Sequence, residues 1–224
     1  MSGPYITRFS AWAPGVEAPG EWDEWARGLR GIHSGPESPE ISYTDSMFRR
    51  RLSQISKMTI QVVHDLLPLG ENTKIFFFSF RGELSRQYQI NKMVIEEGAL
   101  SPAYFSLSVF NAPVALASMA FGLKGGYSAH YPGKNSFTAG ILSAEAALLS
   151  GTTEEIVLVY ADESVPPEYA CFFRECPPPT AFALLLSRDS RPSSVPLSSL
   201  KGHEDNPLDF LKQLLLCGEI HVSS

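Results

Sequence analysis

The chain contains few cysteines, no long apolar segment and no internal repeat. Its three cysteines, Cys171, Cys176 and Cys217, are odd in number and lack tight metal-ligand spacing. This usage is typical of reduced thiols in the cytosol rather than of a disulfide framework. No apolar segment reaches membrane-spanning length, and the N-terminus has no basic stretch followed by an apolar one. We therefore expect a cytoplasmic protein without membrane insertion.

Positive charge is also in deficit. The sequence has 18 Lys and Arg against 24 Asp and Glu, a net charge of −6, which argues against broad binding to nucleic acid. A hydrophobic content of 44% and a charged content of 19% are ordinary for a globular protein of 224 residues. That length is enough for one domain with a well-developed core, so residues 1–224 are predicted to form a single domain.

Strand-like and helix-like segments alternate along the chain, which favours an α/β layered domain. We expect strands at 5–12, 75–80, 155–161, 180–186 and 219–222, with 155–161 covered on both faces. Helices are predicted at 21–29, 48–67, 85–97, 111–123 and 136–148, and from Asn206 onward. The segments 111–123 and 136–148 carry almost no charge, so both helices are expected to be fully buried. The Pro- and Ser-rich residues 188–206 are predicted to form a surface loop within the domain.

A short strand-like segment before residue 131 enters the second uncharged helix through a tight turn. Enzymes with a nucleophilic thiolate use this arrangement to present the sulfur at the positive end of a helix. In this chain the turn carries Gly133, Lys134 and Asn135, and no cysteine. The sequence thus predicts a catalytic scaffold that lacks its nucleophile.

Several stretches in this order resemble the N-terminal half of the ketoacyl synthase family, whose fold is thiolase-like. They are Arg49 to Met58, Ser101 to Pro113, Gly125 to Ala144, and the pair Asp162-Glu163. The chain is most similar to a short subfamily of chain length factors that accompany synthases making aryl polyene pigments. The resemblance implies half of a thiolase-like domain, with the element order βαβαβαββ and buried central helices.

The resemblance also implies that the chain is not an enzyme. Lys134 aligns with the family's nucleophilic cysteine, and a shift of one residue would substitute Gly133 or Asn135, neither of which is competent. The family's two catalytic histidines come from a C-terminal half that this sequence lacks. We expect no catalytic residue, no cofactor and no metal ion, and interpret Lys134 as structural or interfacial rather than as a Schiff-base lysine.

The expected partner is a full-length ketosynthase in a heterodimer, with acyl carrier protein reached through that partner. By resemblance, the strand before the turn would continue the partner's sheet; it comprises Gly126, Tyr127, Ser128, Ala129, His130 and Tyr131. Period-two alternation places Tyr127, Ala129 and Tyr131 on one face. The side chains expected to gate the partner's acyl tunnel by their volume are Phe105, Phe110, Val114 and Met119. The basic run Arg49, Arg50 and Arg51 either docks the acidic carrier or is a solvated helix start.

Two other functions remain open from the sequence. The chain could be an independent acyltransferase or thioesterase that uses Cys171, Cys176 or Lys134, which predicts turnover of an acyl thioester by the chain alone. It could instead be a binding module for a carrier protein, which predicts carrier affinity without any synthase.

Overall fold

The computed structural model describes residues 3–131, 133, 135–173, 176–203 and 206–217. These residues form a six-stranded sheet of order β3-β2-β4-β5-β1-β6. The strands are β1 (Tyr5–Trp12), β2 (Lys74–Phe78), β3 (Tyr127–His130), β4 (Glu155–Asp162), β5 (Thr180–Ser187) and β6 (Val195–Pro196). β2 pairs in parallel with both β3 and β4, whereas the pairs β4–β5, β5–β1 and β1–β6 are antiparallel.

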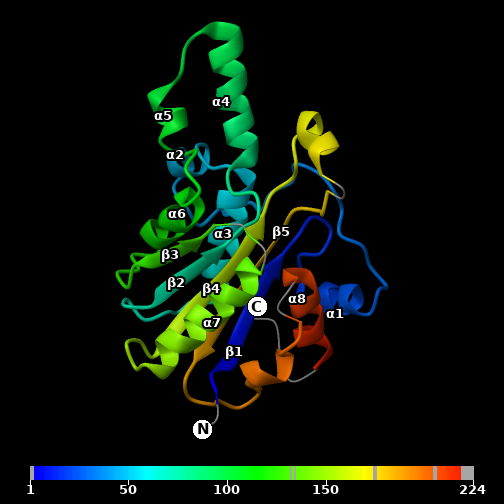
Figure 1. Ribbon diagram of the computed structural model, residues 1–224, viewed down its shortest axis with the longest axis vertical. Coiled ribbons are helices and arrows are strands. Elements are labelled where there is room, and N and C mark those ends of the chain that lie inside the picture. Colours follow the sequence, from blue (N-terminus) through cyan, green and yellow to red (C-terminus); the bar gives the residue numbers. More distant parts are fainter. Residues whose placement is uncertain (1–2, 132, 134, 174–175, 204–205, 218–224) are drawn as a thin grey trace.

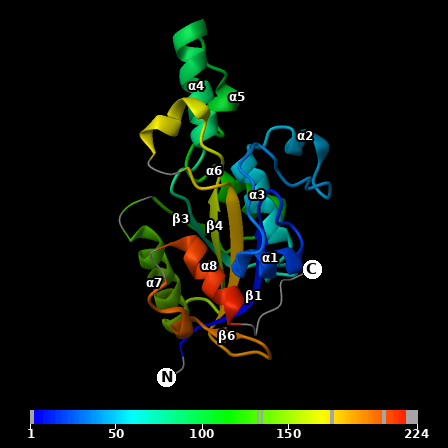
Figure 2. The same ribbon diagram turned by 90° about the vertical axis from the view of Figure 1, so that its right-hand side faces the viewer.

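Helices cover both faces of this sheet (Figures 1 and 2). One face carries α1 (Pro19–Ala26), α7 (Ser136–Leu149) and α8 (Pro207–Leu216), and the other carries α3 (Gln54–His64) and α6 (Ala112–Ala120). Short turns of helix also occur, namely α2 (Ser46–Arg49), η1 (Pro167–Phe172) and η2 (Leu197–Leu200). The arrangement is the layered α/β domain that the sequence predicts.

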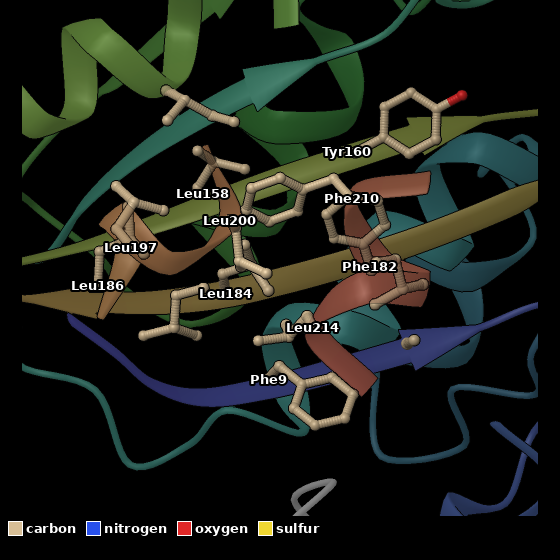
Figure 3. Close-up of a cluster of buried hydrophobic side chains, with 14 of the residues drawn as sticks. Phe9, Leu158, Tyr160, Phe182, Leu184, Leu186, Leu197, Leu200, Phe210 and Leu214 are labelled. Atoms are coloured by element: carbon tan, nitrogen blue, oxygen red, sulfur yellow. The ribbon is translucent and has the colours of Figure 1, made fainter. Parts of the chain in front are cut away.

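The core has two halves because strand residues alternate between faces. In β4, Leu158 and Tyr160 pack with α7 and α8, while Val157 and Val159 pack with α3 and α6. Figure 3 shows the first half, in which Phe210 of α8 approaches the β4 and β5 side chains. All eight residues of β5 are buried, as expected for a strand covered on both faces.

Residues 84–107 form an arm that projects from the layered body (Figures 1 and 2). It consists of α4 (Leu84–Glu97) and α5 (Pro102–Phe105), and Gly98 ends α4 in the left-handed conformation, with φ +62°. Of the described residues of α4, only Arg86 and Ile90 are buried. The arm exposes large apolar side chains, namely Val94, Ile95, Leu100 and Phe105. An exposed apolar arm is unusual for a protein that functions alone.

The structure corrects the burial expected for the two uncharged helices. The C-terminal end of α6 is exposed, with Met119 at 73% exposure, and α7 exposes Leu142 and Leu149. The opposite side of α7 is closely packed, because a Cβ added to Gly140 would lie 1.7 Å from Cε1 of Phe78. The chain itself therefore covers only one face of each of these helices, although neither face carries much charge.

Other predictions need smaller corrections. The helix expected at 48–67 is two helices, because the Ser53 hydroxyl accepts the Ser56 amide at 3.2 Å and caps the start of α3. The presumed surface loop 188–206 contributes β6 and η2, whose Leu197 and Leu200 are buried in the core. The Cys217 side chain, just after α8, is exposed. The strand predicted at 219–222 lies outside the described residues. No helix in the described part of the chain is long and apolar enough to cross a membrane.

Candidate functional site

A cavity of about 570 Å³ lies where β2 and β3 end, beneath the root of the arm. Arg81 lies three residues after β2, Tyr131 directly follows β3, and Phe110 lies two residues before α6. The lining residues from the arm and the segment after it include Gln87, Ile90, Asn91, Phe105 and Ser108. The wall therefore combines aromatic and aliphatic surface with a few polar groups, which is the usual composition of a small-molecule site.

Phe110 is the buried aromatic wall of this cavity. Its ring stacks on Tyr131 with a centroid distance of 4.4 Å and an angle of 17°, and meets Phe77 edge-on at 6.1 Å. Phe110 is 9% exposed whereas Tyr131 is 72% exposed. One ring of the stack is thus anchored in the core, and the other lies at the surface beside the end of β3.

The turn after β2 is held by one buried carboxylate. Asp162 Oδ1, at the end of β4, accepts hydrogen bonds from Ser79 Oγ at 2.6 Å and from the amides of Phe80 and Arg81 at 3.0 Å each. Its other oxygen accepts from the Tyr160 hydroxyl at 2.9 Å and lies 3.5 Å from Arg81 Nε. Burial and the neighbouring Asp162 charge raise the pKa of Tyr160, so its hydroxyl stays a donor. This network fixes the backbone that carries Arg81 into the cavity.

Two further carboxylates, Glu83 and Glu163, anchor the root of the arm. Glu83 accepts from Ser53 Oγ at 2.7 Å and Ser56 Oγ at 2.8 Å, and Glu163 Oε1 accepts the Ser85 amide at 2.7 Å. Burial, together with the charge of Glu83, raises the pKa of Glu163 to about 7. Glu163 Oε2 is buried with no hydrogen-bond partner among the described residues. A buried oxygen in that position favours the protonated acid.

β3 forms one edge of the sheet and, among the described strands, pairs only with β2. The predicted alternation is observed: Tyr127 and Ala129 face α6, where the Tyr127 hydroxyl accepts from Asn111 Nδ2 at 3.0 Å, and His130 faces α7. His130 stacks on Phe78 at 4.5 Å, and burial lowers its pKa. β3 carries neither proline nor lysine, which are common protections of an exposed edge, whereas β6 at the opposite edge contains Pro196.

Two residues of the turn between β3 and α7 are described, Gly133 and Asn135. Asn135 lies at the N-cap of α7 in the left-handed conformation, with φ +63°. Lys134 itself lies outside the described residues.

All three cysteines are exposed, with Cys171 in η1 and Cys176 in the segment after it. Neither Cys171 nor Cys176 lines the cavity at the strand ends. Among the described residues, no group of three or more His, Cys, Asp or Glu is placed to hold a metal ion.

The four predicted gating residues separate into two groups. Phe105 and Phe110 line the same cavity. Val114 is fully buried in the core between α6 and the sheet, and Met119 is exposed near the C-terminal end of α6, so neither lines it. Sequence reasoning missed Arg81 and Gly82, although the small and polar residues directly after the aromatic strand were a signal for a turn there.

The basic run has a structural component. Arg49 Nη1 donates to the carbonyl oxygens of Ile41 and Thr44, both at 3.2 Å. The Arg51 carbonyl accepts from Arg86 Nη2 at 2.9 Å, which connects the run to the arm. Arg50 and the Arg51 side chain are exposed and remain available to an acidic partner.

The fold and this site define a thiolase-like half domain, and comparison with known families makes the assignment specific. Residues 22–212 match the N-terminal domain of beta-ketoacyl synthases. The chain belongs to the beta-ketoacyl synthase family. Comparison with curated protein sequences gives no match.

Solved structures give the same relationship. A chain in the complex of the ketosynthase ApeO with its chain length factor ApeC from Xenorhabdus doucetiae is similar with a TM-score of 0.80 and 25% identity. That match covers 100% of this chain and 96% of the other. The ishigamide ketosynthase/chain length factor is similar with a TM-score of 0.71 and 13% identity, over 85% of this chain and 64% of that one. A ketosynthase from Burkholderia phymatum STM815 gives a TM-score of 0.62 and 11% identity, over 84% and 60%.

Proposed function

We propose that this chain is a chain length factor, a subunit that pairs with a complete ketosynthase and limits the length of its product. The observation that carries the proposal is the match over nearly the full length of both chains with a component of the ApeO–ApeC complex. Ketosynthases with both halves of the fold are longer than this chain, which spans 60% of the B. phymatum enzyme. A matched chain of nearly equal length favours the role of a partner subunit.

The surface supports association with another subunit. The unpaired edge of β3 can accept a strand from a partner, which is a common mode of sheet extension. Apolar side chains flank it on α6, α7 and the arm, among them Met119, Leu142 and Phe105. We propose that the partner's equivalent strand pairs with β3 and that its surface covers these side chains.

The cavity supports a role in limiting length. It lies next to Tyr131, directly after the proposed pairing strand, so a tunnel in the partner could continue into it. Phe110 would then form the end wall, because a buried aromatic ring in a packed core does not yield to an additional methylene without strain. In this account the product stops growing when its distal end reaches Phe110 and Phe105. The product class we propose is a polyene or polyketide chain.

The absence of a cysteine from the nucleophile turn supports a non-catalytic role. A decarboxylative condensation requires a thiolate that holds the growing chain, and residues 131–136 supply none. Within the described part of the chain, the exposed Cys171 Sγ has one hydrogen-bond contact, with the Glu168 carbonyl at 3.8 Å. A reactive thiolate requires a cationic neighbour or a helix N-terminus. We therefore favour the partner-subunit role over an independent acyltransferase or thioesterase.

The test is co-expression with a complete partner ketosynthase. We expect a stable heterodimer by light scattering, and self-association of the chain when it is expressed alone, because its apolar surface is then uncovered. Intact-mass spectrometry after incubation with acyl-carrier thioesters should find the acyl group on the ketosynthase only. A stable monomer that does not pair, or an acyl group attached to this subunit in the absence of ketosynthase, would contradict the proposal.

A further inference from the structure

The turn of residues 79–82 forms a rigid support behind Phe110. Ser79 Oγ, which donates to Asp162, also accepts the Gly82 amide at 2.7 Å and the Arg81 amide at 3.2 Å. The Asp162 carboxylate is 2% exposed and belongs to β4, in the middle of the sheet. The position of Gly82 is therefore set by the sheet rather than by a mobile loop.

Gly82 lies in contact with the ring of Phe110. A Cβ added to Gly82 would lie 2.7 Å from Cδ2 and 3.2 Å from Cε2 of that ring. Real Cβ atoms do not approach other atoms so closely, and the backbone of the turn is pinned by Asp162. The ring must therefore move if residue 82 acquires a side chain.

The packing around Phe110 determines where the ring can move. On one side it contacts Phe77, which is fully buried in the core. On the other side lie the cavity and Tyr131, which is 72% exposed in the single chain. Since a close-packed core resists displacement, the ring would move toward the cavity.

We propose that Gly82 is a positioning residue for Phe110, and that the missing side chain at position 82 sets the depth of the cavity. The inference rests on the proposed function, because it assumes that the cavity receives the end of the growing chain. Gly82 itself does not touch the chain. It determines how far the end wall extends into the space.

The test compares the products of the co-expressed ketosynthase complex containing wild-type chain, Gly82→Ala, Phe110→Ala, and the double variant Gly82→Ala with Phe110→Leu. We expect Gly82→Ala to shift the mean product length down by about one two-carbon extension. The double variant should return it toward wild type, because leucine relieves the contact with the new methyl group.

The matched control is Gly28→Ala. Gly82 and Gly28 both have a positive φ, +58° and +75°, but a Cβ added to Gly28 would meet nothing within 4 Å among the described residues. The control therefore carries similar backbone strain without a steric contact, and it should leave product length unchanged.

Each outcome separates this inference from the proposed function. If Phe110→Ala changes product length while Gly82→Ala does not, the inference is wrong and the proposed function stands. If neither variant changes product length, the proposed function fails as well. If Gly82→Ala prevents assembly, recovery of a complex by the double variant supports the contact, and a double variant that also fails to assemble overturns it.

Discussion

Replacing Ala129 by proline should prevent this chain from pairing with its partner while leaving its own sheet intact. The Ile75 amide donates to the Gly126 carbonyl at 3.1 Å, so Gly126 points its backbone toward β2. Backbone groups alternate along a strand, and residues 128 and 130 therefore also face β2, while 127 and 129 face outward. Proline at an outward position removes no hydrogen bond within the sheet.

The expected loss of binding free energy follows from the hydrogen bond that the outward-facing Ala129 amide would donate to the partner. A partner strand would accept one hydrogen bond from the Ala129 amide, with a net contribution of about 0.5–1.5 kcal/mol. The proline ring would also occupy the space of the approaching carbonyl, which adds a steric term. A total loss of about 2 kcal/mol or more corresponds to a dissociation constant at least about thirtyfold higher.

The assay is titration of the purified ketosynthase with wild-type or variant chain, read by light scattering or mass photometry. Ala129→Ser, which keeps the amide, is the matched control and should pair normally. Circular dichroism of the complexes and of the free chains checks that β2 and β3 remain folded. Wild-type affinity for Ala129→Pro in a folded chain would refute strand pairing through β3.

Two further predictions concern buried charge and the cysteines. Raising the pKa of Glu163 from 4.5 to about 7 makes the native state less stable as pH rises through this interval, by at most about 3 kcal/mol. Glu163→Gln should remove this loss of stability, so that hydrogen exchange of the complex shows equal protection of the α4 amides at pH 5.5 and pH 8. The exposed control variant, Glu97→Gln, should keep the pH-dependent loss of stability. Identical pH dependence in the two variants would contradict the assignment to Glu163. Replacing all three cysteines by serine should leave product formation unchanged, and loss of activity in that variant would revive an independent thiol chemistry.

The sequence predicted β2 and β4 well because their residues strongly favour a buried strand. In the aromatic run Phe76 to Phe78 and the apolar run Ile156 to Ala161, the side chains on both faces of the strand are apolar and are removed from water only when both faces are buried. The helix predicted from Asn206 onward is present, and the Asn206 side chain caps it by accepting the Leu208 amide at 2.9 Å. Local signals of this kind depend on a few adjacent residues and are readable without tertiary structure.

Burial of whole helices could not be predicted, because it depends on surfaces that belong to other elements or other chains. The exposed Met119 and Leu142 look like core residues in the sequence. The contact between Gly82 and Phe110 joins residues 28 positions apart and depends on a turn fixed by Asp162 of a third element. The spacing of apolar residues along the sequence carries no information on such contacts. The cavity could therefore not be predicted from the sequence.

The most direct test of the account is the product-length distribution of the ketosynthase complex containing Phe110→Ala. Removing the ring enlarges the cavity, so products should become longer while the first condensation survives. Truncating a buried phenylalanine also destabilises the fold, by about 3–5 kcal/mol, so Phe110→Leu serves as the milder variant with a smaller shift in the same direction. Unchanged product length in a properly assembled complex of either variant would contradict the claim that this chain limits growth by its volume.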